Sequence, residues 1–246
     1  MKKRFNAALV LAIGLIIVGG TFASAAPSAR AVAKRITRAN EYLLDIMEAP
    51  DISIPEPLLR ACSGVMFVSQ LKFGFIIGAR GGEGLVMVRD EKTKKWSPPA
   101  FIRTAAGTYG FQIGGQSTDA IILIMNKDGV QMLAKTKFKI GVDASASAGP
   151  VGREASASVG PGTAMLVYSR AKGLYAGATF EAGMLIPDYS ANEIFYGVKG
   201  ISVQDILFKN AVPMPQEANS LIMNLEKYAS PLKKETAAET TVPNKE

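Results

Sequence analysis

KFGFIIGARGGEGLVMVRD, residues 72–90, and GTYGFQIGGQSTDAIILIMN, residues 107–126, are the stretches of this chain that say most about its architecture. In both, short runs of β-branched and aromatic residues alternate with glycines, which ordinarily weaken the interior of a strand. Ten of the 24 glycines lie between Gly64 and Gly115, so this glycine density is local. Strands of this kind curve, bulge or let another backbone approach closely. They predict a strongly curved, glycine-rich antiparallel sheet, with barrel-like closure as its extreme form.

The strand pattern continues on both sides of these stretches. Strands are expected at residues 64–84, 85–89, 108–115, 120–125, 164–169 and 174–180. Residues 90–95 and 170–173 are predicted turns, and residues 126–129 are either a hairpin turn or the start of a short helix. DASASAGP at residues 143–150 is nearly repeated by EASASVGP at residues 154–161, and two copies are too few for a solenoid.

Helices are expected at both ends of this region. Val32, Ile36, Ala39, Leu43 and Ile46 fall on one face of a helix over residues 29–49. Residues 188–208 and 214–229 are also predicted to be helical. The fold class is therefore α+β, with N-terminal and C-terminal helices packed on the curved sheet.

The first 25 residues have the pattern of an export signal. Lys2, Lys3 and Arg4 precede an uncharged apolar run, and the sequence Ala-Ser-Ala at residues 23–25 fits a cleavage site. We expect residues 1–25 to be a cleaved signal peptide, with an uncleaved anchor as the alternative. No cysteine stands at the cleavage site, so lipoprotein anchoring is not indicated. The expected location is the periplasm or cell envelope, or the exterior after secretion.

Composition narrows the possible functions. Loss of the three basic residues lowers the formal net charge from +7 to +4, too little for a nucleic-acid binder. One domain is expected over residues 26–230, followed by a disordered tail at residues 231–246 that has little to bury. Cys62 is the only cysteine, which rules out an internal disulfide, and its apolar neighbours predict a small core residue.

The chain contains no histidine. This excludes Ser-His-Asp and Cys-His catalysis and histidine-ligated zinc. Hydrolysis by paired carboxylates or by a Ser-Lys pair remains chemically open, but no spacing in the chain points to either. Asp119, Asp143 and Glu154 are the acids most embedded in the strand pattern. We therefore predict a protein that is not an enzyme and has neither a metal site nor a cofactor.

The helix at residues 29–49 is the main candidate surface. Basic charge beside an apolar stripe is what a helix at a membrane interface needs. The candidate lipid-binding residues are Arg30, Lys34, Arg35, Arg38, Val32 and Ile36. The alternative is an ordinary surface helix whose stripe packs on the sheet, and the acidic second half of the helix favours this alternative. Both hold if the helix undocks.

A weaker candidate lies in the glycine-rich segment at residues 78–84. Arg80, Gly81 and Gly82 are candidates for an anion-binding nest of backbone N–H groups. The segment lacks the Gly-Lys-Ser/Thr ending of a phosphate-binding loop, and a bulged hairpin turn is the favoured alternative.

A series of motifs follows in order along the chain. They are GF at residues 74–75 with Gly78, Gly81 and Gly84, WSPPAF at 96–101, GFQIGG at 110–115, GVD at 141–143, YSR to LYAG at 168–177, and Asn192 with YG at 196–197. In these motifs the chain resembles the SYLF family, whose members are described as lipid-binding and, in fungi, as actin-binding. The resemblance implies a compact α+β domain. In eukaryotic members, an N-terminal amphipathic segment engages acidic phosphoinositide (phosphatidylinositol) lipids.

The resulting functional hypothesis is an exported, non-enzymatic SYLF-type domain that binds an acidic phospholipid or membrane surface. The alternatives are a protein-interaction module, comparable to the actin-binding relatives, and a hydrolase that uses carboxylates. The sequence indicates no oligomeric state.

Overall fold

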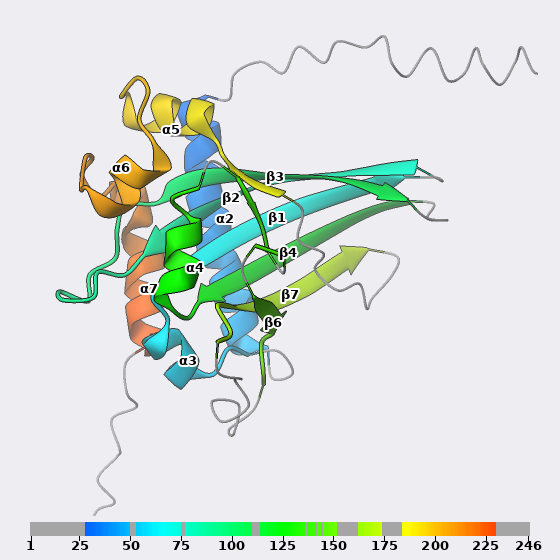
Figure 1. The fold of residues 1–246 in the computed structure, drawn as a ribbon, viewed down its shortest axis with the longest axis horizontal. Coiled ribbons are helices and arrows are strands. Elements are labelled where there is room, and N and C mark those ends of the chain that lie inside the picture. Colours follow the sequence, from blue (N-terminus) through cyan, green and yellow to red (C-terminus); the bar gives the residue numbers. More distant parts are fainter. Residues whose placement is uncertain are drawn as a thin grey trace, which may run out of the picture.

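The computed structural model of the chain has a mixed α+β fold built on one strongly curved sheet, as predicted (Figure 1). The structure describes residues 28–49, 53–74, 77–109, 114–135, 137–140, 142–143, 145–151, 162–173 and 184–229. The expected signal segment, the expected tail and the second copy of the near-repeat lie outside these residues.

The sheet has eight strands in the order β5-β8-β3-β2-β1-β4-β7-β6. The strands are β1 (Gly64–Gly74), β2 (Ile77–Val88), β3 (Ala100–Tyr109), β4 (Gly114–Ile124), β5 (Phe138–Lys139), β6 (Ala146–Ala148), β7 (Met165–Gly173) and β8 (Met184–Pro187). Neighbouring strands are antiparallel except β6 and β7, which pair in parallel. Among the described residues no pairing joins the edge strands β5 and β6, so the sheet is curved but open there.

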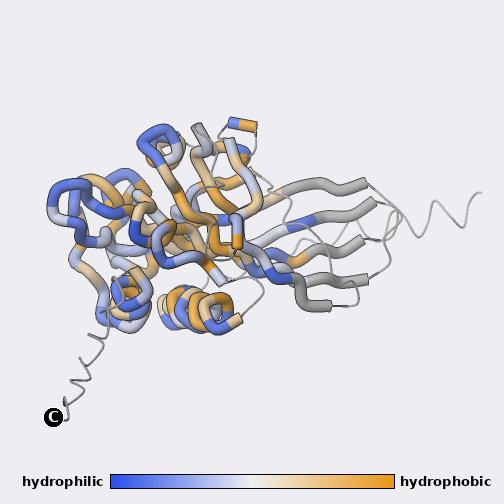
Figure 2. Tube along the Cα trace, turned by 90° about the horizontal axis from the view of Figure 1, so that it is seen from below, coloured by the Kyte–Doolittle hydropathy of each residue, from blue (hydrophilic) through white to orange (hydrophobic). Residues whose placement is uncertain are grey.

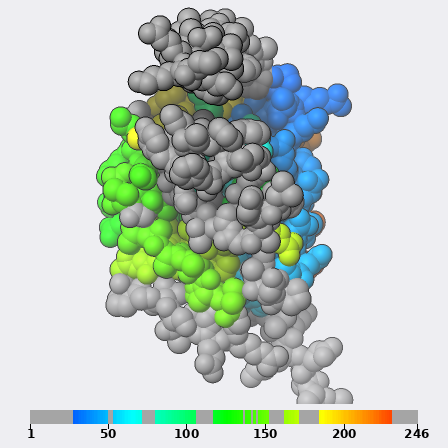
Figure 3. Space-filling model, turned by 90° about the vertical axis from the view of Figure 1, so that its right-hand side faces the viewer, coloured from blue at the N-terminus to red at the C-terminus, as the bar shows by residue number. Residues whose placement is uncertain are grey.

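Helices cover both faces of the sheet. They are α2 (Ala29–Glu48), α3 (Glu56–Ala61), α4 (Lys127–Met132), α5 (Tyr189–Tyr196), α6 (Val203–Phe208) and α7 (Asn219–Ala229), with a 3-10 turn, η2 (Gln216–Ala218), before α7. In the end-on view, α2 (blue) lies on one side of the molecule and the residues around α4 to β6 (green) on the other (Figure 3).

Alternation along the strands divides the core in two. Val65 and Phe67 of β1 point to the face where α2, α3, α5 and α7 pack, whereas Met66 and Val68 join a second cluster that includes α6. Hydrophobic residues gather where the strands meet the helices (Figure 2). The buried Cys62 belongs to the α2-side cluster, which confirms its prediction as a core residue.

Strand boundaries differ from the sequence expectation in the glycine-rich region. Residues 78–84, for which a bulged hairpin turn was the favoured alternative to an anion nest, lie inside β2 and pair with both β1 and β3. A Cβ atom at Gly84 would overlap the carbonyl oxygen of Phe67, and one at Gly82 would overlap that of Ser69. Glycine therefore serves close approach between strands here, one of the roles expected from the composition, and not a turn.

Other helix and strand boundaries also differ from those expected from the sequence. Residues 170–173, expected as a turn, complete β7. Of the two alternatives for residues 126–129, the helix is correct, because the Asn126 side chain caps α4 by accepting from the N–H of Gly129. The helix expected over residues 188–208 is two helices, because Gly197 and Gly200 adopt φ values of 68° and 73° between them.

Candidate functional site

The apolar stripe of α2 faces the sheet. The Ser28 side chain begins the helix by accepting a hydrogen bond from the N–H of Ala31. Val32 and Ile36, two of the candidate lipid-binding residues, are fully buried in the α2-side cluster. The packing is that of the surface-helix alternative, so in the docked helix these two side chains are not accessible to hydrocarbon.

Arg35, a third candidate, is a buried ion-pair residue. Its side chain is 8% exposed, with Nη1 2.8 Å from Asp188 Oδ2 and Nε 2.8 Å from Glu83 Oε2. The guanidinium also lies over the ring of Phe101, 5.9 Å from its centroid. Arg35 thus holds α2 to β2 and to the start of α5.

Asp188 is the centre of this charge cluster. It caps α5 by accepting from the N–H of Ala191, and its Oδ1 lies 3.5 Å from Arg103 Nε. The aspartate before a helical run is a recognisable N-cap signal in the sequence. No local pattern links it to Arg35, which lies 153 residues away.

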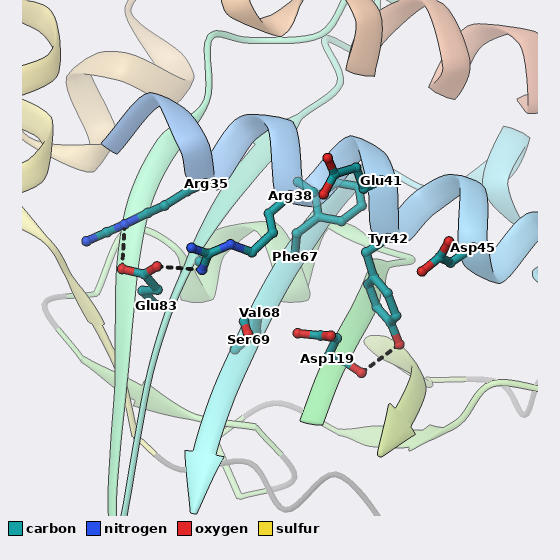
Figure 4. A pocket seen from close by; sticks show the side chains of 12 residues that line it. Arg35, Arg38, Glu41, Tyr42, Asp45, Phe67, Val68, Ser69, Glu83 and Asp119 are labelled. Atoms are coloured by element: carbon teal, nitrogen blue, oxygen red, sulfur yellow. Dashed lines mark hydrogen bonds and ion pairs between the residues drawn. The ribbon is translucent and has the colours of Figure 1, made fainter. Parts of the chain in front are cut away.

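Arg38 is half exposed and paired. Its Nη1 donates to Glu83 Oε1 at 2.9 Å, so Glu83 bridges Arg35 and Arg38 (Figure 4). Glu83, Asp188 and Arg103 were not among the residues singled out from the sequence. Charge patterning along single elements cannot find them, because their partners lie on other strands and helices.

The charges continue across the sheet as one row. Strand register places Arg103, Glu83, Ser69, Asp119 and Arg170 opposite one another on β3, β2, β1, β4 and β7. Directly opposed residues share a face of the sheet, and this row follows the last apolar row beneath α2.

Tyr42 of α2 contacts the other end of this row, at β4 and β7. Its hydroxyl donates to the carbonyl oxygen of Asp119 at 2.6 Å and accepts from the N–H of Arg170 at 3.0 Å. Burial raises the pKa of Tyr42 well above its usual value. The cavity of about 90 Å³ between α2 and the row has room for a few water molecules but not for a lipid headgroup. This cluster therefore attaches the helix; it is not a ligand cavity.

Arg30 and Lys34 are the two candidate cations that remain available. Both are exposed on α2, and neither forms an ion pair within the described part of the chain. Arg30 lies beside a groove of about 540 Å³ whose wall includes Phe195, Tyr196 and Glu217. The groove lining contains one cation, Arg30, and one carboxylate, that of Glu217, so the groove itself has no excess positive charge. The excess positive charge lies on the amino-terminal end of α2.

The charges of α2 run against its dipole. The first turn contains no acidic residue and the last turn no basic one; Arg30 lies near the N-terminus, and Asp45 and Glu48 near the C-terminus. Each such charge opposes a preference of about 0.3–1 kcal/mol. Helix stability therefore does not account for Arg30.

The anion nest expected at Arg80, Gly81 and Gly82 does not have the required backbone. All three residues lie in the paired interior of β2, where successive N–H groups point alternately toward β1 and β3. A nest needs successive N–H groups that converge on one point. The expectation is corrected because tertiary pairing extends the strand through the glycines.

The carboxylates considered for hydrolysis are not brought together as a described pair. Asp143 accepts a hydrogen bond from the N–H of Lys139 in a turn, and Glu154 lies outside the described residues. Among the described residues, no group of three histidine, cysteine or acidic side chains is arranged to hold a metal ion. Within the same residues, no helix is both long and apolar enough to span a membrane.

Comparison with known proteins gives the family. The Ysc84 family, described as a Las17-binding protein actin regulator, matches residues 105–228. SH3 domain-containing YSC84-like protein 1 of Rattus norvegicus is 35% identical over 186 residues, which are 73% of this chain and 54% of the relative. Protein YSC84 of Saccharomyces cerevisiae is 32% identical over 184 residues, 73% of this chain and 39% of that protein.

A further relative, LAS seventeen-binding protein 3 of S. cerevisiae, is 35% identical over 152 residues, 60% of this chain and 33% of its own length. The chain thus spans about half or less of the length of these relatives. No solved structure matches it. The family description is that of an actin regulator and not of an enzyme. Since the family model matches half of the chain, and relatives that are 32–35% identical cover 73% of it, this protein belongs to the Ysc84, or SYLF, family.

Proposed function

We propose that this protein is a non-enzymatic, exported domain that binds acidic membrane surfaces through the amino-terminal end of α2. The supporting observation is the pair of exposed cations, Arg30 and Lys34, which have no carboxylate partner among the described residues. A cation near an anionic lipid surface contributes about 1 kcal/mol to binding. The export signal expected at residues 1–25 brings the domain to the cell envelope.

In this proposal the helix stays docked. Undocking would expose Val32 and Ile36, and it would also break the buried pair between Arg35 and Asp188. Breaking a buried pair costs about 3–5 kcal/mol, more than two surface cations return. Binding is therefore electrostatic and peripheral.

Vesicle co-sedimentation tests the proposal. The wild-type protein should sediment with vesicles that contain phosphatidylglycerol and remain in solution with pure phosphatidylcholine. Replacing the two cations by Arg30→Glu and Lys34→Glu should lower the partition coefficient by at least about thirtyfold, since two contributions of about 1 kcal/mol are lost and repulsion is added.

The matched control is Lys135→Glu with Lys137→Glu. These two exposed lysines lie outside α2 and give the same change in net charge. The control should sediment nearly as well as the wild type. Equal losses in both double variants, or no sedimentation of the wild type with acidic vesicles, would disprove the proposal.

A second candidate function is that of a protein-interaction module. It is favoured by the family description and by the names of the relatives, among them an LAS seventeen-binding protein. In this reading the domain presents a surface to a protein partner, and the fold supplies a groove for it on another part of the molecule.

A further inference from the structure

A groove of about 800 Å³ lies between the loop at residues 89–97, α4 and α6. Its volume is in the range of sites that hold a ligand or a short peptide segment. Most of its apolar lining, such as Val88, Val130 and Leu207, belongs to or packs on the core cluster opposite α2. The groove is thus separate from the membrane surface proposed above.

The rim of the groove is basic. Four cations line it, Arg89, Lys92, Lys95 and Lys127, against the two carboxylates of Asp90 and Glu91. Glu91 pairs with Lys127, with Oε2 and Nζ 3.2 Å apart. The carboxylate of Asp90 is engaged in its own turn.

Hydrogen bonds hold Asp90 in that turn. Its Oδ1 accepts from the N–H of Lys92 at 3.0 Å and from the N–H and hydroxyl of Thr93 at 2.7 and 2.9 Å. These bonds lower the pKa of Asp90, so the carboxylate is ionised at neutral pH, but they direct it into the loop. Lys92 also interacts electrostatically with Asp90, but Arg89, Lys92 and Lys95 form no ion pair with a carboxylate in the described part of the chain.

Arg89 is fixed in position without being neutralised. Its Nε donates to the carbonyl of Lys94 at 2.9 Å and its Nη1 to that of Arg60 at 3.0 Å. The guanidinium lies 5.5 Å from the centroid of the Trp96 ring. Carbonyls and an aromatic face orient an arginine and leave its charge for an anion.

One wall of the groove is apolar and exposed. Phe208, at the end of α6, lines the groove and is 43% exposed. An aromatic side chain of this size left half in water contributes substantial free energy when a partner covers it. The groove thus combines one apolar contact with several separated cations.

We infer that this groove binds an acidic peptide segment of a protein partner, with carboxylates at the three unpaired cations and a large apolar side chain against Phe208. Lys92 and Lys95 lie on the loop, whereas Arg89 lies at its β2 end. Spaced cations match the spaced carboxylates of an extended peptide better than the concentrated charge of one headgroup. The inference makes the second candidate function specific and does not depend on membrane binding.

Fluorescence anisotropy with the full chain tests this inference. The probe is a fluorescein-labelled peptide, Glu-Asp-Phe-Glu-Asp-Glu, compared with peptides in which Gln and Asn replace the acids or Ser replaces Phe. The acidic peptide should bind, and each replacement should weaken binding by about tenfold or more. Added salt should also weaken binding, because the charges at the rim are exposed.

Two variants locate the site. Lys92→Gln with Lys95→Gln should raise the dissociation constant about tenfold, and Phe208→Ala should raise it severalfold. The matched control, Lys135→Gln with Lys137→Gln, removes the same charge from residues that do not line the groove, and it should bind like the wild type. Urea midpoints near that of the wild type establish that each variant is folded.

Several results would overturn the inference. They are failure of the wild type to bind the acidic peptide, equal effects of the groove and control variants, and tighter binding of laurate or of a short oligothymidylate than of the peptide. The last two ligands represent a lipid and a nucleic acid. Vesicle binding does not enter these measurements, so the inference and the membrane proposal can fail separately.

Discussion

Single residues of this protein carry tasks that their residue type alone does not reveal. Arginine is usually a surface residue, but Arg35 lies in a buried cluster. Glycine is typical of turns, but Gly84 lies inside a strand. In both cases the deciding contact comes from a distant part of the chain.

Asp188→Asn should lower the free energy of unfolding by about 2–4 kcal/mol, because it leaves Arg35 buried beside one carboxylate instead of two. Asparagine can also cap the helix, so the loss of unfolding free energy measures the effect of removing the negative charge. Glu91→Gln removes a carboxylate from an exposed pair and should cost less than about 1 kcal/mol. Urea denaturation of the two variants measures the difference, and equal losses would contradict the buried-cluster account.

Gly84→Ala should destabilise the protein by about 1–3 kcal/mol, since the new methyl group would overlap the carbonyl of Phe67. Gly81→Ala is the control in the same strand, because its nearest neighbour would be the Thr104 carbonyl oxygen at 3.9 Å. Alanine there should be neutral or slightly stabilising. Thermal and urea midpoints of both variants test the assignment of these glycines to a strand interior.

Burial raises the pKa of the Cys62 thiol to about 12 from a reference value of 9.0. The folded state then keeps a proton that the unfolded state loses, so the contribution to stability is complete below pH 9.0 and declines between there and about pH 12. The slope is about 1.4 kcal/mol per pH unit. Stability of wild type relative to Cys62→Ala should therefore fall above pH 9.0, and a constant difference would refute the buried-thiol account.

At the scale of elements, α2 combines two roles on its two sides. The apolar stripe, Arg35 and Tyr42 attach it to the sheet, while Arg30 and Lys34 remain outside. The exposed charges oppose the helix dipole, so the helix is less stable than its length allows. The helix end used in the membrane proposal is therefore also the end at which a charge opposes the dipole.

Arg30→Glu should raise the free energy of unfolding by about 0.3–1 kcal/mol while it lowers binding to acidic vesicles. Glu48→Lys, at the other end of α2, should also stabilise the protein but should not weaken vesicle binding. Calorimetry and co-sedimentation on the same samples measure both effects. A loss of stability in Arg30→Glu would show that the dipole argument is wrong.

At the scale of the whole molecule, the sheet separates two proposed binding surfaces. The helix α2 lies on one face, whereas the basic groove is lined by the loop at residues 89–97 and by apolar side chains that belong mostly to the core of the other face. The lining of the groove includes no residue of α2, so a ligand on one surface should leave the contacts of the other unchanged. The two surfaces are expected to act independently.

Saturating acidic peptide should therefore leave the vesicle partition coefficient unchanged within about twofold, which corresponds to less than about 0.5 kcal/mol of coupling. Co-sedimentation with and without the peptide makes the comparison, with the neutral peptide as control. Strong competition would place both ligands on one surface.

The fold class, α2 and parts of β1, β2, β4 and β7 could be predicted from local sequence patterns. Periodicity of two and of 3.6 residues is local and can be recognised from neighbouring residues, whereas most of β3 and all of β5 and β8 lie outside the expected strands. The same local patterns predicted the amphipathic face of α2, the core position of Cys62 and the curved glycine-rich sheet.

Which of the predicted site residues are accessible depends on long-range contacts of the folded chain. Arg35 and Arg38 meet Glu83, and Arg35 meets Asp188, across 45 to 153 residues of chain. Because β2 pairs with both β1 and β3, residues 78–84 form a strand and not a turn. The loop at residues 89–97, α4 and α6 together form the basic groove. Long-range contacts set register and ion-pair partners, and a local pattern carries no information about either.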